Sequence, residues 1–164
     1  MTRTARNATI SVLIVLLGSL GVASGASASD ASVKAAVLAR TAQFHKVAAQ
    51  QSKAFDKWTK AHHSRKTSKP LLKTLKAAGK LENVDSKAVK AEAPSTAIGA
   101  QAKQDILQSN AYYSRYLTSL EKAVRLATKG KISAANTQIK LATGYAQQSA
   151  KQSVAAKKLL VQIS

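Results

Sequence analysis

The chain has 164 residues, no cysteine, and a formal net charge of +19 from 26 Lys and Arg against 7 Asp and Glu. This length suits a single domain, and the lack of cysteine excludes disulfides, thiolate metal sites and a lipoprotein anchor. The charge bears on solubility and on attraction to polyanions rather than on the fold.

Residues 1–28 have the pattern of a secretory signal peptide. Arg3 and Arg6 form a positive start, an apolar run covers 10–17, and small residues that suit cleavage lie at 24–28. The apolar run is short for a membrane span, which needs about 20 residues. We therefore expect cleavage and a secreted or periplasmic protein, with a retained anchor as the alternative. The mature sequence shows no transmembrane span.

Residues 31–64 are predicted to form one long helix. Apolar and uncharged residues recur in steps of four and three, which places them on one face. These seam residues are Val37, Thr41, Phe44, Ala48, Gln51, Phe55, Trp58 and His62. A row of lysines falls on the opposite face at about 100° per residue. It consists of Lys46, Lys53, Lys57 and Lys60.

Residues 65–95 are less regular and predict a broken second helix over 69–93. Pro70 suits a helix start, and Gly79 can end a first piece. Asn83 or Asp85 can cap a second piece that stops before Pro94. A mobile basic connection is the alternative for this segment.

Two further helices, over 96–128 and 131–163, are predicted to form a hairpin folded at Gly130, which can take the left-handed conformation. On the first arm, the seam comprises Ile106, Asn110, Tyr113, Leu117, Leu120, Val124 and Ala127. On the second arm, it comprises Ile132, Ala135, Ile139, Ala142, Ala146, Ser149, Ser153, Ala156, Leu160 and Ile163. The spacing within each seam is that of a helical packing face.

A fold point at Gly130 sets which residues of the two arms meet. Tyr116 should lie level with Gly144, and Tyr113 should lie close to Ala146. Leu107 should face Ser153. Because glycine within a helix costs about 1 kcal/mol relative to alanine, we expect Gly144 to let a tyrosine ring approach the backbone. The alternative is a tolerated defect without a packing role.

These elements together predict an all-α fold for residues 29–164. Three long helices and the short, broken second helix would form an antiparallel bundle that resembles a four-helix bundle.

The sequence predicts neither an enzyme nor a metal or cofactor site. His45 and His63 are separated by about 27 Å of helix, at 1.5 Å per residue. No His-x-x-x-His or Glu-x-x-His pair occurs. The acidic residues are scattered, whereas general acid–base catalysis needs tuned groups that share one cleft.

Aromatic side chains offer candidate contacts with a protein partner. Tyr112, Tyr113 and Tyr116 cluster, with Tyr145 nearby in the predicted hairpin. Ring stacking on a ligand is one interpretation, and packing in the bundle seam is the other. Tyr112, one position off the seam, and Trp58 are the candidate partner contacts.

The lysine rows are the candidate contacts with polyanions. A second row on the last helix, Lys140, Lys151 and Lys158, joins the row at 46–60. A merely solvated surface explains both rows as well. Arginine is scarce in the mature chain, which argues against nucleic acid as a partner because bidentate geometry matters there.

The leading hypothesis is a non-enzymatic envelope or extracellular protein that binds anionic envelope polymers or lipid headgroups. One alternative is a membrane-surface protein that inserts an amphipathic C-terminal end, formed by Lys157, Lys158, Leu159, Leu160, Val161 and Ile163. The other alternative is a protein-interaction module, such as an inhibitor or adaptor.

Overall fold

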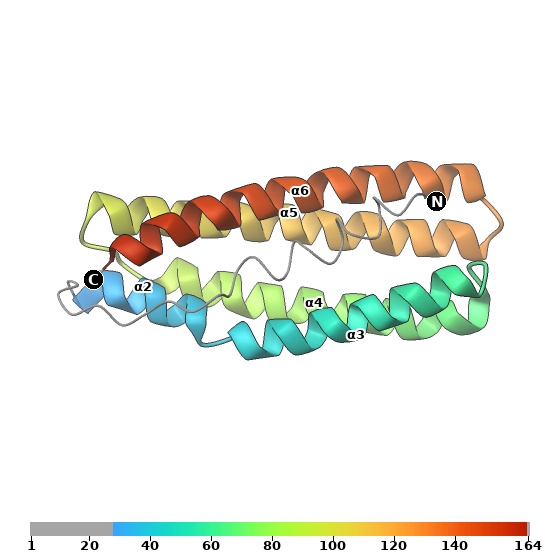
Figure 1. The fold of residues 1–164 in the computed structure, drawn as a ribbon, viewed down its shortest axis with the longest axis horizontal. Coiled ribbons are helices and arrows are strands. Elements are labelled where there is room, and N and C mark those ends of the chain that lie inside the picture. Colours follow the sequence, from blue (N-terminus) through green and yellow to red (C-terminus); the bar gives the residue numbers. More distant parts are fainter. Residues whose placement is uncertain (1–27, 164) are drawn as a thin grey trace.

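The computed structural model describes residues 28–163. Within them 89% of the residues are helical and there is no strand, so the predicted all-α class is confirmed. The helices are α2 (Ala28–Leu38), α3 (Thr41–Lys60), α4 (Arg65–Ala91), α5 (Ala97–Thr128) and α6 (Ile132–Gln162). The four long helices α3 to α6 lie lengthwise, with α2 at the end near the C-terminus (Figure 1). Apart from Ala28, the predicted signal peptide lies outside the described residues.

The predicted long helix over 31–64 is interrupted, which corrects the first helix boundary. α2 ends at Leu38, and α3 begins at Thr41 after Arg40, whose φ and ψ are −114° and 2°. No glycine or proline marks this position in the sequence. The break has a packing reason, because the two segments contribute to separate apolar clusters.

The second helix, predicted to be short and broken, is instead continuous for 27 residues. It begins at Arg65, where the Ser64 hydroxyl accepts a hydrogen bond from the Thr67 amide at 3.3 Å. Neither Gly79 nor Asp85 interrupts it. The buried residues Leu71, Leu75, Ala78, Glu82, Asp85 and Val89 follow one another in steps of four and three. Because two members of this buried repeat are acidic, the pattern of apolar residues alone does not predict one continuous helix.

The α5–α6 hairpin has the predicted turn and register. Gly130 has a φ of 73°, and the Lys131 amide donates to the Leu126 carbonyl across the turn. The Ser109 hydroxyl, 21 residues before Gly130, contacts the hydroxyls of Ser149 and Ser153, 19 and 23 residues after it. All seven predicted seam residues of the first arm are buried. On the second arm Ile132 is exposed and Ile139 is half-buried, whereas the other predicted seam residues are buried.

Two apolar clusters fill the interior. The larger one contains Phe44, Trp58, Leu75, Tyr113 and Leu120. The smaller one, at the α2 end, contains Val33, Val37, Val89, Ile106, Ala156 and Leu160. Since α2 supplies only the smaller cluster and α3 only the larger, the break at Arg40 allows each segment to pack independently.

A polar layer separates the two clusters along α4, α5 and α6. It consists of Glu82, Asp85, Ser86, Ser109, Asn110, Ser149 and Ser153. The Asn110 amide donates to Asp85 Oδ2 at 3.0 Å, and the Ser86 hydroxyl donates to Glu82 Oε1 at 2.8 Å. These bonds offset the cost of burying polar groups.

The predicted packing role of Gly144 is wrong. Gly144 is exposed, and a Cβ added there would have no atom within 4 Å outside its own local backbone. Tyr113 and Tyr116 instead stack on each other with ring centroids 5.6 Å apart and contact Gln51 of α3. The small residues that face α5 include Ala142 and Ala146, which are buried on a different side of α6.

Candidate anion-binding groove

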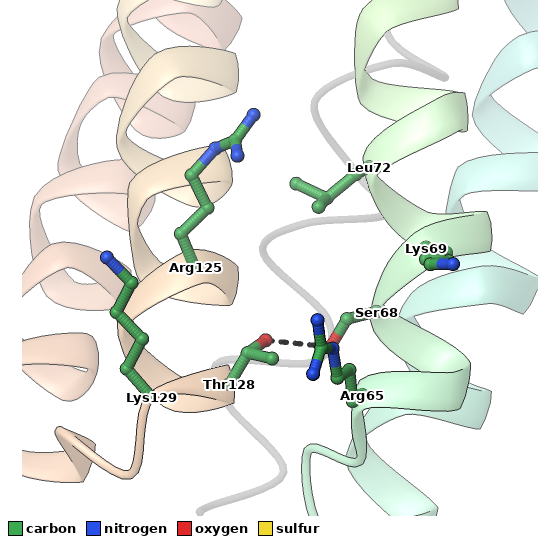
Figure 2. A pocket seen from close by; sticks show the side chains of 7 residues that line it. All are labelled: Arg65, Ser68, Lys69, Leu72, Arg125, Thr128 and Lys129. Carbon is green, nitrogen blue, oxygen red and sulfur yellow. Dashed lines mark hydrogen bonds between the residues drawn. The ribbon is translucent and has the colours of Figure 1, made fainter.

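A pocket of about 510 Å³ lies between α4 and α5 near the end of the bundle that contains the Gly130 turn. Arg125, Thr128 and Lys129 line it on the α5 side, and Figure 2 shows the Thr128 hydroxyl pointing toward Ser68 of α4. The α4 residues that line it are Arg65, Ser68, Lys69 and Leu72. None of the residues that line the pocket is acidic.

A second pocket continues the first one along α4. Both pockets are lined by Lys69, Leu72 and Arg125, so we treat them as one depression, the α4–α5 groove. The basic residues of the groove are Arg65, Lys69, Lys73, Lys76, Lys80, Arg125 and Lys129. Leu72 and Ala77 contribute apolar surface.

The helical register of α4 places its cations in a line. Its five basic groove residues follow one another in steps of four, four, three and four, so they share one face. From Arg65 to Lys80 they cover about 22 Å, at 1.5 Å per residue. The neighbouring buried seam at Leu71, Leu75 and Ala78 fixes this face beside the inter-helix boundary.

Hydrogen bonds join the α4 and α5 sides of the groove at the Arg65 end. The hydroxyls of Ser68 on α4 and Thr128 on α5 lie 3.0 Å apart (Figure 2). Ser68 Oγ also accepts a hydrogen bond from Trp58 Nε1 at 3.0 Å. Since Trp58 is fully buried, this chain of contacts ties the groove wall to the core.

Most of the positive charge in the groove is left without an acidic neighbour. Arg125 donates from Nη2 and Nε to Glu121 Oε1, at 2.6 and 3.1 Å. Among residues 28–163, the structure records no ion pair for Arg65, Lys69 or Lys129. Uncompensated like charges that line a depression focus a positive potential there and attract anions.

The lysines proposed from the sequence lie elsewhere on the surface. Lys46, Lys53, Lys57 and Lys60 are exposed on α3, and Lys140, Lys151 and Lys158 are exposed on α6. None of them lines the groove.

Sequence reasoning missed the groove residues, although their spacing on α4 was a usable signal. Because the helix was predicted to be broken, these residues were not expected to share one face. Arginine was judged by its number alone, whereas the fold brings Arg65 and Arg125 into one pocket.

The two candidate partner contacts differ in their environment. Tyr112 is half-buried, with the Arg115 guanidinium 5.7 Å from its ring centre. Trp58 has 0% of its surface exposed, so its assignment as a surface contact is wrong. Its indole ring packs against Phe55 and His63. A joint platform of four tyrosines is not formed, because Tyr113 and Tyr116 are buried.

The buried carboxylates of the polar layer belong to the core and do not line the groove. Burial raises the pKa of Glu82, and the nearby Asp85 adds to this effect. Burial also raises the pKa of Asp85, while the hydrogen bond from Asn110 and the charge of Arg40 oppose the increase. The sequence predicts Asp85 as a possible cap of a separate helical piece, whereas the continuous α4 buries it.

The apolar residues at the C-terminal end of α6 are divided between the core and the surface. Leu160 and Ile163 are buried in the smaller cluster, and Leu159 packs against it. Val161 is exposed. Within 28–163, no helix combines the length and apolar character needed to cross a bilayer.

Comparisons with known proteins add no family to this description. A scan against protein-family models found no match, and searches of curated proteins and of solved structures found no similar chain.

Proposed function

We propose that this protein is a non-enzymatic, secreted or envelope-associated binder of anionic polymers, and that the α4–α5 groove is its binding surface. The observation that carries the proposal is the convergence of seven basic side chains from two helices on a depression without an acidic lining residue. A linear polyanion lying along α4 would meet a cation roughly every 4.5–6 Å, given a rise of 1.5 Å per residue.

The groove supports this function better than the outer lysine rows do. Water and salt screen the exposed lysines of the outer rows and of the groove alike, so the difference between them lies in geometry. In the groove, cations from two elements act on the same volume, beside the apolar surface of Leu72. We therefore assign binding to the groove and not to the positive charge spread over the whole surface.

The two alternative functions depend on residues that are mostly buried. The membrane-surface hypothesis needs the apolar end of α6, where Leu160 and Ile163 are buried. For the protein-interaction hypothesis, only Tyr112 remains as a partly exposed candidate, since Trp58 is inaccessible.

The test is retention of the purified protein on isolated cell envelopes across a series of salt concentrations. A groove variant carries Lys69→Gln, Lys73→Gln, Lys76→Gln and Lys80→Gln. The matched control carries Lys46→Gln, Lys53→Gln, Lys57→Gln and Lys60→Gln on α3. Both variants lose four exposed charges from one helix, so they differ in position and not in net charge.

We expect the wild type and the α3 variant to remain bound at moderate salt and to be released as salt increases. The groove variant should be released at clearly lower salt. Equal weakening of both variants would assign binding to overall charge and reject the groove. A wild type that is not retained on envelopes at low salt would reject the proposed function itself.

A further inference from the structure

The Arg65 end of the groove differs from the rest because arginines line it from both sides. Outside the predicted signal peptide the chain has four arginines, Arg40, Arg65, Arg115 and Arg125. Two of them, Arg65 on α4 and Arg125 on α5, line the same pocket (Figure 2). The remainder of the groove on α4 is lined by lysines.

This difference matters because arginine and lysine bind anions in different ways. The planar guanidinium presents several N–H donors in a fixed fork that matches the oxygens of phosphate, whereas the lysine ammonium acts as a compact point charge. Glu121 accepts hydrogen bonds from Arg125 Nε and Nη2 through a single oxygen, which restrains this guanidinium. Its remaining N–H groups stay available to a ligand.

Hydrogen bonds also connect the pocket wall to the core. Ser68 and Thr128 join α4 to α5 through their hydroxyls, and Trp58 Nε1 holds Ser68 in place. Leu72 adds an apolar side to the pocket. Lys69 and Lys129 bring the positive charges of the pocket to four.

We propose that the pocket formed by Arg65, Lys69, Arg125 and Lys129 is a discrete binding site for a phosphate group. This inference rests on the proposed function and specifies the chemistry of the polymer as a phosphate-containing chain. The arginines would bind one phosphate, and the lysines of the groove would contact the rest of the chain. A phosphate group offers more oxygens to the two guanidinium groups and two ammonium groups than a carboxylate does.

Trp58 makes the proposal measurable, because it is the only tryptophan of the chain and its indole N–H bonds to the pocket wall. In isotope-labelled protein, the indole N–H gives one NMR signal that reports on Ser68. The titrants are inorganic phosphate, dimethyl phosphate and acetate, at constant pH and ionic strength. Inorganic phosphate represents the end group of a polymer, and dimethyl phosphate represents an internal diester.

We expect a saturable shift of the Trp58 signal with at least one of the two phosphates, and only a small, linear change with acetate. Saturation by inorganic phosphate alone would indicate an end-group site, and saturation by the diester would indicate an internal one. A linear response to both phosphates, or an equal response to acetate, would overturn the proposal.

Charge-conserving variants separate geometry from charge. Arg65→Lys and Arg125→Lys should each weaken phosphate binding by about tenfold, because a bidentate contact is lost while the charge stays. Arg115→Lys is the matched control, since Arg115 is exposed on α5 and lies outside the pocket. Thermal melts establish that all three variants fold. Unchanged phosphate affinity in folded Arg65→Lys and Arg125→Lys would also overturn the proposal.

The phosphate site and the polymer function can fail separately. Groove-dependent retention on envelopes without saturable phosphate binding would reject the phosphate site and leave polymer binding standing. Saturable phosphate binding by a protein that envelopes do not retain would reject polymer binding and leave the phosphate site standing.

Discussion

Gly99 in the first turn of α5 lies directly against the carboxylate of Asp30 in α2, and a Cβ at Gly99 would overlap that carboxylate. Asp30 accepts hydrogen bonds from the Ser95 amide at 2.8 Å, from the Thr96 amide at 3.3 Å and from the Thr96 hydroxyl. A residue of one helix thus caps the start of another. This contact fixes α2 against the end of the bundle.

Gly99→Ala should therefore destabilise the protein, by about 1–3 kcal/mol as for other overpacked sites. Chemical or thermal unfolding measures the change in free energy. The Asp30→Ala background is the control, because removal of the carboxylate removes the overlap. In that background Gly99→Ala should be neutral or favourable, since alanine suits a helix better than glycine. An equal loss in both backgrounds would contradict the close contact.

Acid should weaken this same contact. Hydrogen bonds, above all the one from the Thr96 hydroxyl, hold the pKa of Asp30 below its ordinary value of 3.8. A carboxyl whose pKa is lowered by folding stabilises the folded protein above its unfolded pKa, and this contribution is lost as pH falls through the folded value.

We therefore expect Asp30→Asn to lower the melting temperature at neutral pH. The difference from the wild type should decrease as pH falls below 3.8, the ordinary pKa of the carboxyl. Melting curves measured by circular dichroism at several pH values test this. A difference that persists unchanged to the lowest pH would show that the charge of Asp30 is irrelevant.

Sequence periodicity predicts most of the core, because burial follows the helical repeat wherever seam residues are apolar. On α5 the repeat from Ile106 to Ala127 is buried as expected, and the turn at Gly130 sets the register of α6. On α4 the same repeat passes through Glu82 and Asp85, whose charge normally marks a surface. The continuity of α4 therefore depends on partners such as Asn110, which only the fold brings close.

The break at Arg40 and the groove could not be predicted either, because both depend on contacts between residues far apart in the chain. No glycine or proline lies at the break, and although the basic residues of α4 are regularly spaced, the α5 side of the groove lies about 50–60 positions later in the chain. The break follows from two clusters that need separate helices, and the groove follows from the register of α4 against α5. Both are tertiary properties that override local propensity.

The polar layer predicts a pH effect of opposite sign to that of Asp30. Burial raises the pKa of Glu82, and the group lies near Asp85, Lys90, the Ser86 hydroxyl and Tyr113 of α5. A carboxyl whose pKa is raised by folding destabilises the folded state when it is ionised. This cost is relieved as pH falls from above the folded pKa toward the unfolded value.

Glu82→Gln should therefore raise the melting temperature at neutral pH, since an amide oxygen can still accept the hydrogen bond from Ser86. The advantage over the wild type should shrink as the pH is lowered through the folded pKa of Glu82. Melting curves across this range provide the measurement. An advantage that grows on acidification would show that burial of Glu82 is not the cause.

Gly144 offers a stabilising substitution. It lies on the exposed face in the interior of α6, and a Cβ there would meet no atom within 4 Å beyond the local backbone. Gly144→Ala should increase the free energy of unfolding by about 0.5–1 kcal/mol, because alanine loses less backbone entropy in a helix. Denaturant unfolding measures the gain. A loss of stability would restore the packing role that the sequence suggested for this glycine.

The two turns at the same end of the bundle form the same hydrogen-bond pattern with different residues. The His62 and His63 amides donate to the Thr59 and Trp58 carbonyls after α3, as the Gly130 and Lys131 amides do to Ala127 and Leu126 after α5. This is the Schellman arrangement, whose left-handed position favours glycine. His62 occupies that position with a φ of 48°, whereas Gly130 has a φ of 73°.

His62→Gly should stabilise the protein by about 1 kcal/mol, because a side chain strains the left-handed conformation and the exposed His62 ring contributes little packing. Gly130→Ala is the reciprocal control and should destabilise by a similar amount, since nothing near Gly130 would contact the added Cβ. Thermal melts at pH above the histidine range compare the two variants without a change in charge. If both substitutions lowered the melting temperature, strain at His62 would be excluded, and the His62 side chain would have to hold the turn itself.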